Sequence, residues 1–354
     1  MTPEPNRERA APPSTPGPSG PGAAVAPRWA TLTRPFYAAD LVTIAFLACL
    51  IALALVCAAR IPMWPAVVAT SAAIIALLTG LAVTHAKYDW RGVRFLHSWA
   101  FAPLAYVIYA EIHWVIGPIH QGWIADDALI AIDRALFGGN PIEWFGAIAR
   151  PWLTEIAQIA YTLFYALVVA VGAELYLRRS EADFQRFSFA CACAFLGSYV
   201  GYFLVPAVGP RFTLYDLSSI ERDLPGLLLT TPLRTFVDAG GMVPVGAPQS
   251  VALGLAHRDV FPSGHTMMTL VSIWWSWRMR LAARWPVTVV GALLVFATMY
   301  LRYHYVIDVM AGAALAAVAV RLLPGAWEPV AARLRTRPCD ESVTGPTTAR
   351  APRA

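Results

Sequence analysis

Long apolar stretches run through most of this chain and decide what it can fold into. About eight of them reach roughly 18 residues, the length that an α-helix needs to cross the hydrocarbon layer of a membrane. Of all residues, 58% are hydrophobic and only 14% are charged, and the mean hydropathy is +0.54, so one soluble core could not bury the apolar surface. The sequence therefore predicts an all-α fold, a polytopic membrane helix bundle of about eight transmembrane helices. The predicted spans are 41–59, 64–84, 100–118, 156–177, 187–207, 265–281, 286–303 and 304–323.

The arginine residues predict how the chain is oriented in the membrane. With eight spans, the basic segments around Arg91, Arg178 and Arg278 all fall on one side, which the positive-inside rule makes cytoplasmic. Both termini are then cytoplasmic, and His265 and His304 lie at the extracytoplasmic face of the plasma (inner) membrane. The boundary near 300–304 is inferred from length alone, and seven spans would move the C-terminus to the other side.

The composition also divides the chain into regions. Residues 1–30 are rich in Pro, Ala, Gly and Ser without periodicity, and residues 338–354 look similar, so both are predicted to be disordered cytoplasmic tails. The first two spans, within 41–84, are joined by a short connection and form an accessory transmembrane hairpin. The later spans form a core of six helices over 100–323.

Two longer segments, 119–155 and 208–262, interrupt the core, and long connections in compact proteins are usually functional or disordered. Residues 126–137 have apolar side chains at helical spacing with charges on the other face, which predicts a short amphipathic helix in the membrane interface. Residues 208–262 contain many Pro and Gly and are predicted to be loop. This loop either covers the helix ends as a lid or is an ordinary surface loop.

The tetrapeptide Pro262-Ser263-Gly264-His265 stands directly before an apolar helix. Pro favours a helix start, Ser can cap the helix, and Gly allows a bound group to approach the backbone. The free N–H groups of the first helical turn then point at an anion such as phosphate. The alternative is a plain N-cap at a membrane boundary, for which the same residues are suitable.

A second pair, His304 and Asp308, is predicted at the end of another apolar helix. Four residues apart on a helix, the carboxylate can hold one imidazole nitrogen and leave the other exposed. That arrangement orients a nucleophile or a base. Ionisable groups within a span are costly and therefore indicate function. A structural His–Asp pair closing a helix end is the alternative.

Cationic side chains on the same predicted face are candidates for binding a phosphate. Arg211 follows a span directly, and Arg302 lies two residues before His304. A guanidinium group suits bidentate contacts with phosphate oxygens, although either side chain could instead extend to lipid headgroups. His257 and Asp259, just before the tetrapeptide, could shape the substrate entrance but are not included in the predicted site.

The net charge of +5 does not indicate nucleic-acid binding, because the Arg residues follow the topology and form no basic stripe interleaved with aromatic residues. No metal or other cofactor is expected, since no predicted extracytoplasmic cluster of carboxylates could hold one. The sequence leaves the oligomeric state open.

These residues resemble the signature of the type 2 phosphatidic acid phosphatase superfamily, K-x6-R-P, P-S-G-H and S-R-x5-H-x3-D. The segment 262–265 matches the second element, and His304 with Asp308 matches the end of the third. The first element is absent, and Gly209-Pro210-Arg211 stands in for it. Thr298 occupies the usual Arg position of the third element. The sequence of Tyr300–Gly312 is more similar to the branch of inositol phosphorylceramide synthases and their bacterial relatives.

This resemblance, which covers roughly residues 100–323, implies a catalytic six-helix core and a metal-independent reaction on a membrane lipid phosphate. It implies that His304, oriented by Asp308, attacks phosphorus to give a phosphohistidine, and that His265 protonates the leaving alkoxide. The phosphoryl oxygens would bind Arg211, Arg302 and the backbone around Ser263 and Gly264.

Three functions remain open at this point. With water as the acceptor the protein is a lipid-phosphate phosphatase, and with an alcohol acceptor it is a phosphotransferase that moves a phospho-headgroup between lipids. A protein of a different class, which binds or transports lipid without catalysis, is the third.

Overall fold

The computed structural model describes residues 35–88 and 90–334, and this part of the chain consists of helices joined by turns and short connections, with no strand. The tails predicted at 1–30 and 338–354 lie outside the described residues. In chain order the elements are α2 (Ala38–Val56), α3 (Trp64–Tyr88), α4 (Arg91–Trp99), α5 (Phe101–Ile119), α6 (Asp126–Phe137), α7 (Pro141–Trp144), η1 (Phe145–Ile148), α8 (Pro151–Thr162), α9 (Phe164–Arg178), α10 (Glu181–Leu204), α11 (Pro210–Thr213), η2 (Leu217–Ser219), α12 (Ile220–Asp223), α13 (Thr230–Gly240), α14 (Gln249–Leu255), α15 (Gly264–Arg278), α16 (Arg284–Tyr300) and α17 (Val306–Leu334).

Several of these helices are long and apolar enough to cross a membrane, as the sequence predicted. Within the described residues there are 5 such segments, α2, α3, α4 with α5, α10 and most of α17, and up to 6 if the bent pair α8 and α9 is one span. Helices α15 and α16, at 15 and 17 residues, are shorter than the other predicted spans. The turn expected near 300–304 is present, because α16 ends at Tyr300 and α17 begins at Val306. The polytopic all-α bundle is confirmed.

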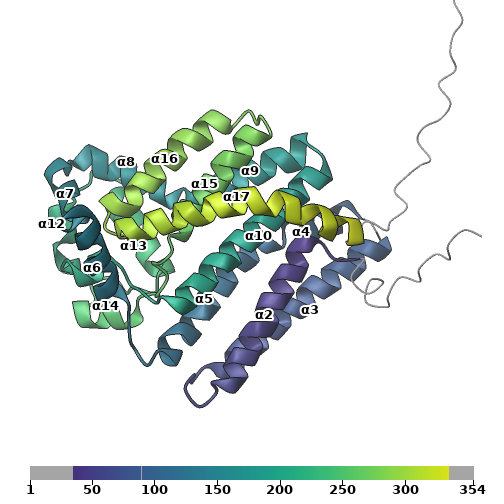
Figure 1. The fold of residues 1–354 in the computed structure, drawn as a ribbon, viewed down its shortest axis with the longest axis horizontal. Helices are drawn as coiled ribbons and strands as arrows, with labels where there is room; N and C mark the ends of the chain where they lie inside the picture. Colours follow the sequence, from purple (N-terminus) through teal and green to yellow (C-terminus); the bar gives the residue numbers. More distant parts are fainter. Residues whose placement is uncertain (1–34, 89, 335–354) are drawn as a thin grey trace, which may run out of the picture.

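Helix α10 is the centre of the bundle. It packs against α2, α5, α9, α15 and α17, and it is the most buried of the candidate spans. Figure 1 shows α2 and α3 together at one side of the bundle, while the short helices α6, α7, α12, α13 and α14 gather at one end. The predicted hairpin of the first two spans is therefore an attachment to a larger helical body.

The two interrupting segments are more structured than the sequence indicated. The prediction of loop over 208–262 is wrong for much of its length, because α11, η2, α12, α13 and α14 form there. One reason is visible at Glu155 of α8, whose carboxylate accepts hydrogen bonds from the backbone N–H groups of Leu227, Leu228, Leu229 and Thr230, at distances of 2.6 to 3.1 Å. This carboxylate caps the first turn of α13, a long-range contact that local composition does not encode.

Helix α6 forms where the amphipathic pattern predicted it, but its acidic face is not solvated. Asp126 and Asp133 are buried. Asp133 accepts hydrogen bonds from the N–H groups of Val306 and Ile307, each 2.9 Å long, and so caps the start of α17. Asp126 accepts hydrogen bonds from the N–H groups of residues 208 and 209, at 3.0 and 2.8 Å. The predicted helix is therefore present, but two of its carboxylates are buried in contacts with other segments.

Burial alone raises the pKa of Asp126 and of Asp133, and the hydrogen bonds from backbone N–H groups lower it in part. Tyr305 adds a further contact, because its hydroxyl donates to Asp126 at 2.8 Å. Through these contacts α6 holds both the segment that leads to Arg211 and the start of α17.

Candidate active site

The N-terminus of α15 supplies the first part of the site. Ser263 is the N-cap residue, and its hydroxyl accepts a hydrogen bond from the N–H of Thr266 at 3.2 Å. The N–H of Ser263 donates to the carbonyl oxygen of Asp308 at 3.0 Å, which ties α15 to the first turn of α17. A Cβ atom at Gly264 would collide with the hydroxyl of Tyr202, so only glycine fits this position. The predicted helix start is thus present, with its first turn against α10.

The turn between α16 and α17 supplies His304. The N–H groups of Tyr303 and His304 both donate to the carbonyl oxygen of Thr298, at 3.0 and 2.9 Å, and this closes the chain into a tight turn after α16. His304 therefore precedes α17, which begins at Val306, whereas the sequence suggested that His304 and Asp308 share a helix. The His304 side chain is buried, and its ring lines the cavity described below.

The immediate partner of His304 is a backbone carbonyl. Nδ1 of His304 donates to the carbonyl oxygen of Val260 at 3.0 Å, and Oδ2 of Asp308 lies 3.6 Å from the same nitrogen. Oδ2 also accepts a hydrogen bond from the N–H of Tyr305 at 2.7 Å. Because a carbonyl only accepts, Nδ1 must carry the proton, and Nε2 of the neutral ring keeps its lone pair. Val260 thus shares with Asp308 the orienting role that was predicted for the carboxylate.

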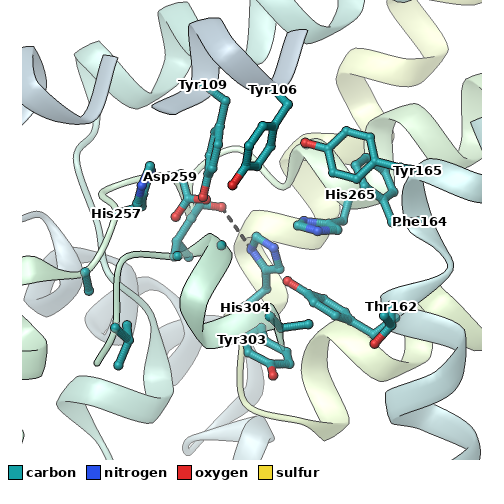
Figure 2. Close-up of a pocket in the computed structure, with 18 of the residues that line it drawn as sticks. Tyr106, Tyr109, Thr162, Phe164, Tyr165, His257, Asp259, His265, Tyr303 and His304 are labelled. Carbon is teal, nitrogen blue, oxygen red and sulfur yellow. Dashed lines mark hydrogen bonds between the residues drawn. The ribbon is translucent and has the colours of Figure 1, made fainter. Parts of the chain in front are cut away.

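The two predicted histidines meet at one wall of the cavity. The ring centroids of His265 and His304 are 5.6 Å apart, and Figure 2 shows both rings facing the same space. His265 stacks on Tyr161 at 4.6 Å and packs against Phe164 at 4.4 Å between ring centroids. Two contacts of about 3 Å each would span the gap, so one phosphoryl group can touch both imidazoles.

The two predicted arginines lie in different surroundings. Arg211 lines the cavity, its guanidinium packs over the ring of Tyr303 at 4.8 Å, and its Nη1 donates to Asp238. Arg302 is also buried but is not among the cavity residues. The structure therefore places Arg211 in the cavity with the histidines and places the Arg302 side chain outside it.

The surroundings of Arg302 account for its direction. Its Nη1 donates to Oδ2 of Asp223 at 3.0 Å, and its guanidinium lies 3.6 Å from the centroid of the Tyr215 ring. The hydrogen bond from Arg302 lowers the pKa of the Asp223 carboxyl. These contacts attach the segment 215–223 to the turn that carries His304.

Gly209 sets the approach of the Arg211 segment to this turn. Its φ is +97°, in the left-handed region, and a Cβ atom there would meet the carbonyl oxygen of Tyr303. The N–H of Arg211 donates to the carbonyl oxygen of Arg302 at 3.1 Å. The Gly-Pro-Arg element that replaces the first family element thus packs directly on the His304 turn.

The cavity has a volume of about 760 Å³, and many Tyr and Phe side chains line it. It is open at the side, since Tyr106 of α5 and Tyr165 and Val169 of α9 line it and are 45%, 40% and 44% exposed. A smaller cavity of about 60 Å³ shares Tyr165 and Val169 with it and continues to Trp99 and Phe184. The apolar space therefore extends from the histidines along α5 and α9.

Sequence reasoning missed several residues of the site. Tyr161, Phe164 and Tyr165 have i, i+3, i+4 spacing within one apolar stretch of the sequence, which was a usable signal, although Tyr161 lies at the end of α8 and the other two at the start of α9. The carbonyl of Val260 and the carboxylate of Asp238 gave no signal, because contacts between distant segments leave no periodic pattern. Within the described residues, no group of three or more His, Cys, Asp or Glu side chains could hold a metal ion.

A family comparison agrees with this geometry. The model of the PAP2 superfamily matches residues 127–322, which is more than half of the 354-residue chain. The chain belongs to the PAP2 superfamily, which indicates a phosphatase-type enzyme. No curated relative and no solved structure matches it significantly. The matched region begins in α6, so it holds every predicted site residue and leaves α2 to α5 outside.

Proposed function

We propose that this protein is an integral membrane phosphatase that cleaves a lipid phosphate through a phosphohistidine formed on His304. The observation that carries the proposal is the 5.6 Å separation of the His265 and His304 rings at the wall of one cavity. Membership of the PAP2 superfamily supports the phosphatase-type reaction.

In the first half of the proposed cycle, Nε2 of His304 forms a bond to phosphorus as the bond from phosphorus to the lipid oxygen breaks. His265, in its protonated form, donates its proton to the departing alkoxide. Arg211 and the N–H groups at the start of α15 stabilise the charge on the phosphoryl oxygens. The hydrogen bond from Nδ1 of His304 to Val260, with Asp308 nearby, supports this role, because it stabilises the positive charge that the ring gains.

In the second half, His265 removes a proton from water, and the oxygen of that water forms the new bond to phosphorus as the bond to Nε2 breaks. Phosphate leaves, and His265 is again protonated while His304 is again neutral. Each His265 transfer is general acid–base catalysis, which contributes about 10² to 10⁴ in rate.

A lipid substrate is supported by the side opening of the cavity. The exposed rim residues Tyr106, Tyr165 and Val169 are apolar for most of their surface, and the smaller cavity continues the apolar path along α5 and α9. We propose that acyl or prenyl chains occupy this path while the phosphoryl group reaches the histidines. We further propose that the site faces the extracytoplasmic side, as the Arg distribution indicates, and that the segment 208–262, which contributes Phe236 and Val237 to the cavity, acts as its lid.

The test is turnover of a panel of lipid phosphates by the protein purified in detergent. Wild type should release phosphate, and His304→Ala should release none, while His97→Ala, at a residue that does not line the cavity, should keep the wild-type rate. Phosphate should appear covalently on the wild-type protein after a rapid quench in alkaline denaturant, because the bond from phosphorus to the imidazole nitrogen is stable in alkali and labile in acid. Retained turnover in His304→Ala would contradict the nucleophile, and no turnover of any lipid by wild type would favour a lipid-binding protein without catalysis.

A second candidate is a phosphotransferase that passes a phospho-headgroup from one lipid to an acceptor alcohol. The observation that favours it is the size of the cavity together with a second polar group, Asp259, on its wall. Assaying headgroup transfer and free phosphate release on the same lipid separates the two, because only the transferase yields a new phosphodiester.

A further inference from the structure

The cavity contains a carboxylate that the proposed reaction does not use. Asp259 lies on the connection from α14 to α15, and Figure 2 shows its carboxylate facing the space shared by His265 and His304. Within the described part of the chain, its hydrogen bond comes from the Tyr109 hydroxyl, 2.6 Å from Oδ2, and no basic side chain forms an ion pair with it. A partly buried carboxylate thus faces the ligand space with one oxygen unused.

The neighbours of Asp259 do not supply a positive charge. His257 stacks on Tyr109 at 4.3 Å between ring centroids, and burial lowers the pKa of His257 to about 4, so the imidazole is neutral at pH 7. The guanidinium of Arg258 packs beside Gly117 and is not among the residues that line the cavity.

The guanidinium that does line the cavity is already paired. Arg211 donates to Asp238, so the positive charge offered to a ligand is partly offset before the ligand binds. In the transferase form of the proposed function the bound phosphodiester carries one negative charge, which protonated His265, Arg211 and the first turn of α15 face. The separate negative charge of Asp259 therefore favours a phosphodiester whose headgroup carries a positive charge.

The walls beside Asp259 are suited to such a charge. Tyr106, Tyr109, Tyr165 and Tyr199 line the same cavity with their rings in contact, and the faces of aromatic rings attract ammonium groups. A carboxylate among aromatic rings is a binding site for an ammonium group, whereas a neutral hydroxyl group gains only a hydrogen bond there.

We propose that Asp259 and the surrounding tyrosines form a subsite for the ammonium group of a zwitterionic phosphodiester headgroup. The inference rests on the proposed function in its transferase form. The ammonium group occupies the Asp259 subsite while the phosphoryl group lies between His265 and His304, and the phospho-headgroup is the unit that is transferred.

The test compares two soluble diesters that differ in one group. Glycerophosphoethanolamine carries an ammonium group, and the same diester with ethylene glycol in place of ethanolamine carries a hydroxyl group. Binding is measured by calorimetry on His304→Ala protein in detergent, which prevents turnover. The ammonium diester should bind about tenfold more tightly. Equal affinities, or no binding of either diester, would overturn the subsite without any substitution at Asp259.

Substitutions then assign the preference to this carboxylate. Asp259→Asn should reduce the preference to less than about twofold, while Asp127→Asn, which removes an exposed carboxylate outside the cavity, should leave it unchanged. Asp259→Glu should retain the preference if Asp259→Asn does not fold. A preference that survives Asp259→Asn in folded protein would refute the assignment.

Two further experiments ask whether the ammonium group belongs to a lipid headgroup and whether the subsite depends on the proposed catalysis. Phosphatidylethanolamine and phosphatidylglycerol in mixed micelles should displace the soluble diester, the first more effectively, if the headgroup of a lipid is the natural occupant. Displacement by neither lipid would restrict the subsite to soluble diesters and so refute a lipid headgroup. Turnover retained in His304→Ala would contradict the proposed function alone, because the preference between the two diesters does not depend on which residue attacks phosphorus.

Discussion

Two buried clusters of histidine and carboxylate lie near opposite ends of α10, and they differ in what surrounds them. Near its N-terminus, Nε2 of His97 donates to Asp40 at 2.8 Å, and Nδ1 of His85 lies 3.0 Å from Nδ1 of His97. We call these three residues the α2–α4 cluster. Near the C-terminus of α10, about 36 Å away by the rise of a helix of 24 residues, His304 lines the cavity and Asp308 lies buried behind it, 3.6 Å from its Nδ1.

The difference between the clusters is one of access. In the α2–α4 cluster the ring of Tyr37 stacks on His97 at 4.3 Å, and none of the three cluster residues lines the large cavity. At His304 one ring nitrogen is held by Val260 and the other is directed to a space that a ligand can enter. The same residue types therefore stabilise a helix junction in one place and are available for chemistry in the other.

The largest expected effect separates the clusters directly. His304→Ala should lower kcat by at least about 10⁴-fold, because the nucleophile is lost, while His97→Ala should change kcat less than about threefold in folded protein. Phosphate release measured on size-exclusion-purified protein checks both. Equal losses in the two variants would remove the distinction between a catalytic and a structural cluster.

His265 should show the next largest effect, and the effect should depend on the leaving group. With an alkyl ester, His265→Ala should lower kcat about 10² to 10⁴-fold, because the alkoxide needs a proton. With a nitrophenyl ester, formation of the phosphoenzyme should fall much less, and phosphate should accumulate on the protein since the second half lacks its base. Rapid-quench labelling measures this, and an equal defect with both esters would contradict the acid role.

The two arginines should differ in kind. Arg211→Ala should lower kcat/KM about 10²-fold, because it removes a charge from the cavity, while Arg302→Ala should lower it less than about tenfold and reduce heat stability. Initial rates over a range of substrate concentration and thermal melts give both values. If Arg302→Ala matched Arg211→Ala in kcat/KM, Arg302 would belong to the phosphate site, as the sequence predicted.

A substitution in the α2–α4 cluster should lower the stability of the fold and leave turnover unchanged. Asp40→Asn weakens the buried hydrogen bond from His97 and should cost about 1 to 3 kcal/mol of folding free energy, which appears as a lower midpoint in a thermal melt in detergent. Phosphate release at low temperature, where the variant stays folded, should equal that of wild type. A loss of turnover at that temperature would mean that this cluster acts on the site.

The smallest effect concerns pH. The hydrogen bond from Arg302 lowers the pKa of Asp223 in the folded protein, so the pair stabilises the fold above the ordinary carboxyl pKa of about 3.9 and loses this effect as the pH falls through the folded-state value. The difference between the melting midpoints of wild type and Asp223→Asn should be constant at pH 6 to 7 and should begin to shrink as the pH falls below about 4, through the lowered pKa of Asp223. A constant difference across this range would contradict the linkage.

The sequence predicted the parts of the fold that depend on local pattern. Hydropathy averaged over the length of a span predicted the helix bundle, and Ser263 and Gly264 predicted the start of α15. Both features depend on residues that are neighbours in the chain. The direction of Arg302 was missed because it depends on Asp223, far away in the chain. The α2–α4 cluster was missed for the same reason, since the contacts of His97 with Asp40 and with His85 join residues from three different helices.

Asp259 shows a different limit. Its position next to the tetrapeptide was visible in the sequence, but nothing there revealed that its charge is unpaired, because that depends on where Arg258 and Arg211 point. A sequence can predict that a residue lies near a site. Its electrostatic partners are determined only when several helices have packed.

Helix α6 contacts both halves of the active site through two carboxylates, although it has only 12 residues and is not one of the candidate spans. A short helix of this kind can unwind at a temperature at which the spanning helices remain intact. Slow heating should therefore inactivate the enzyme while circular dichroism still reports nearly full helix content, and brief cooling should restore its activity.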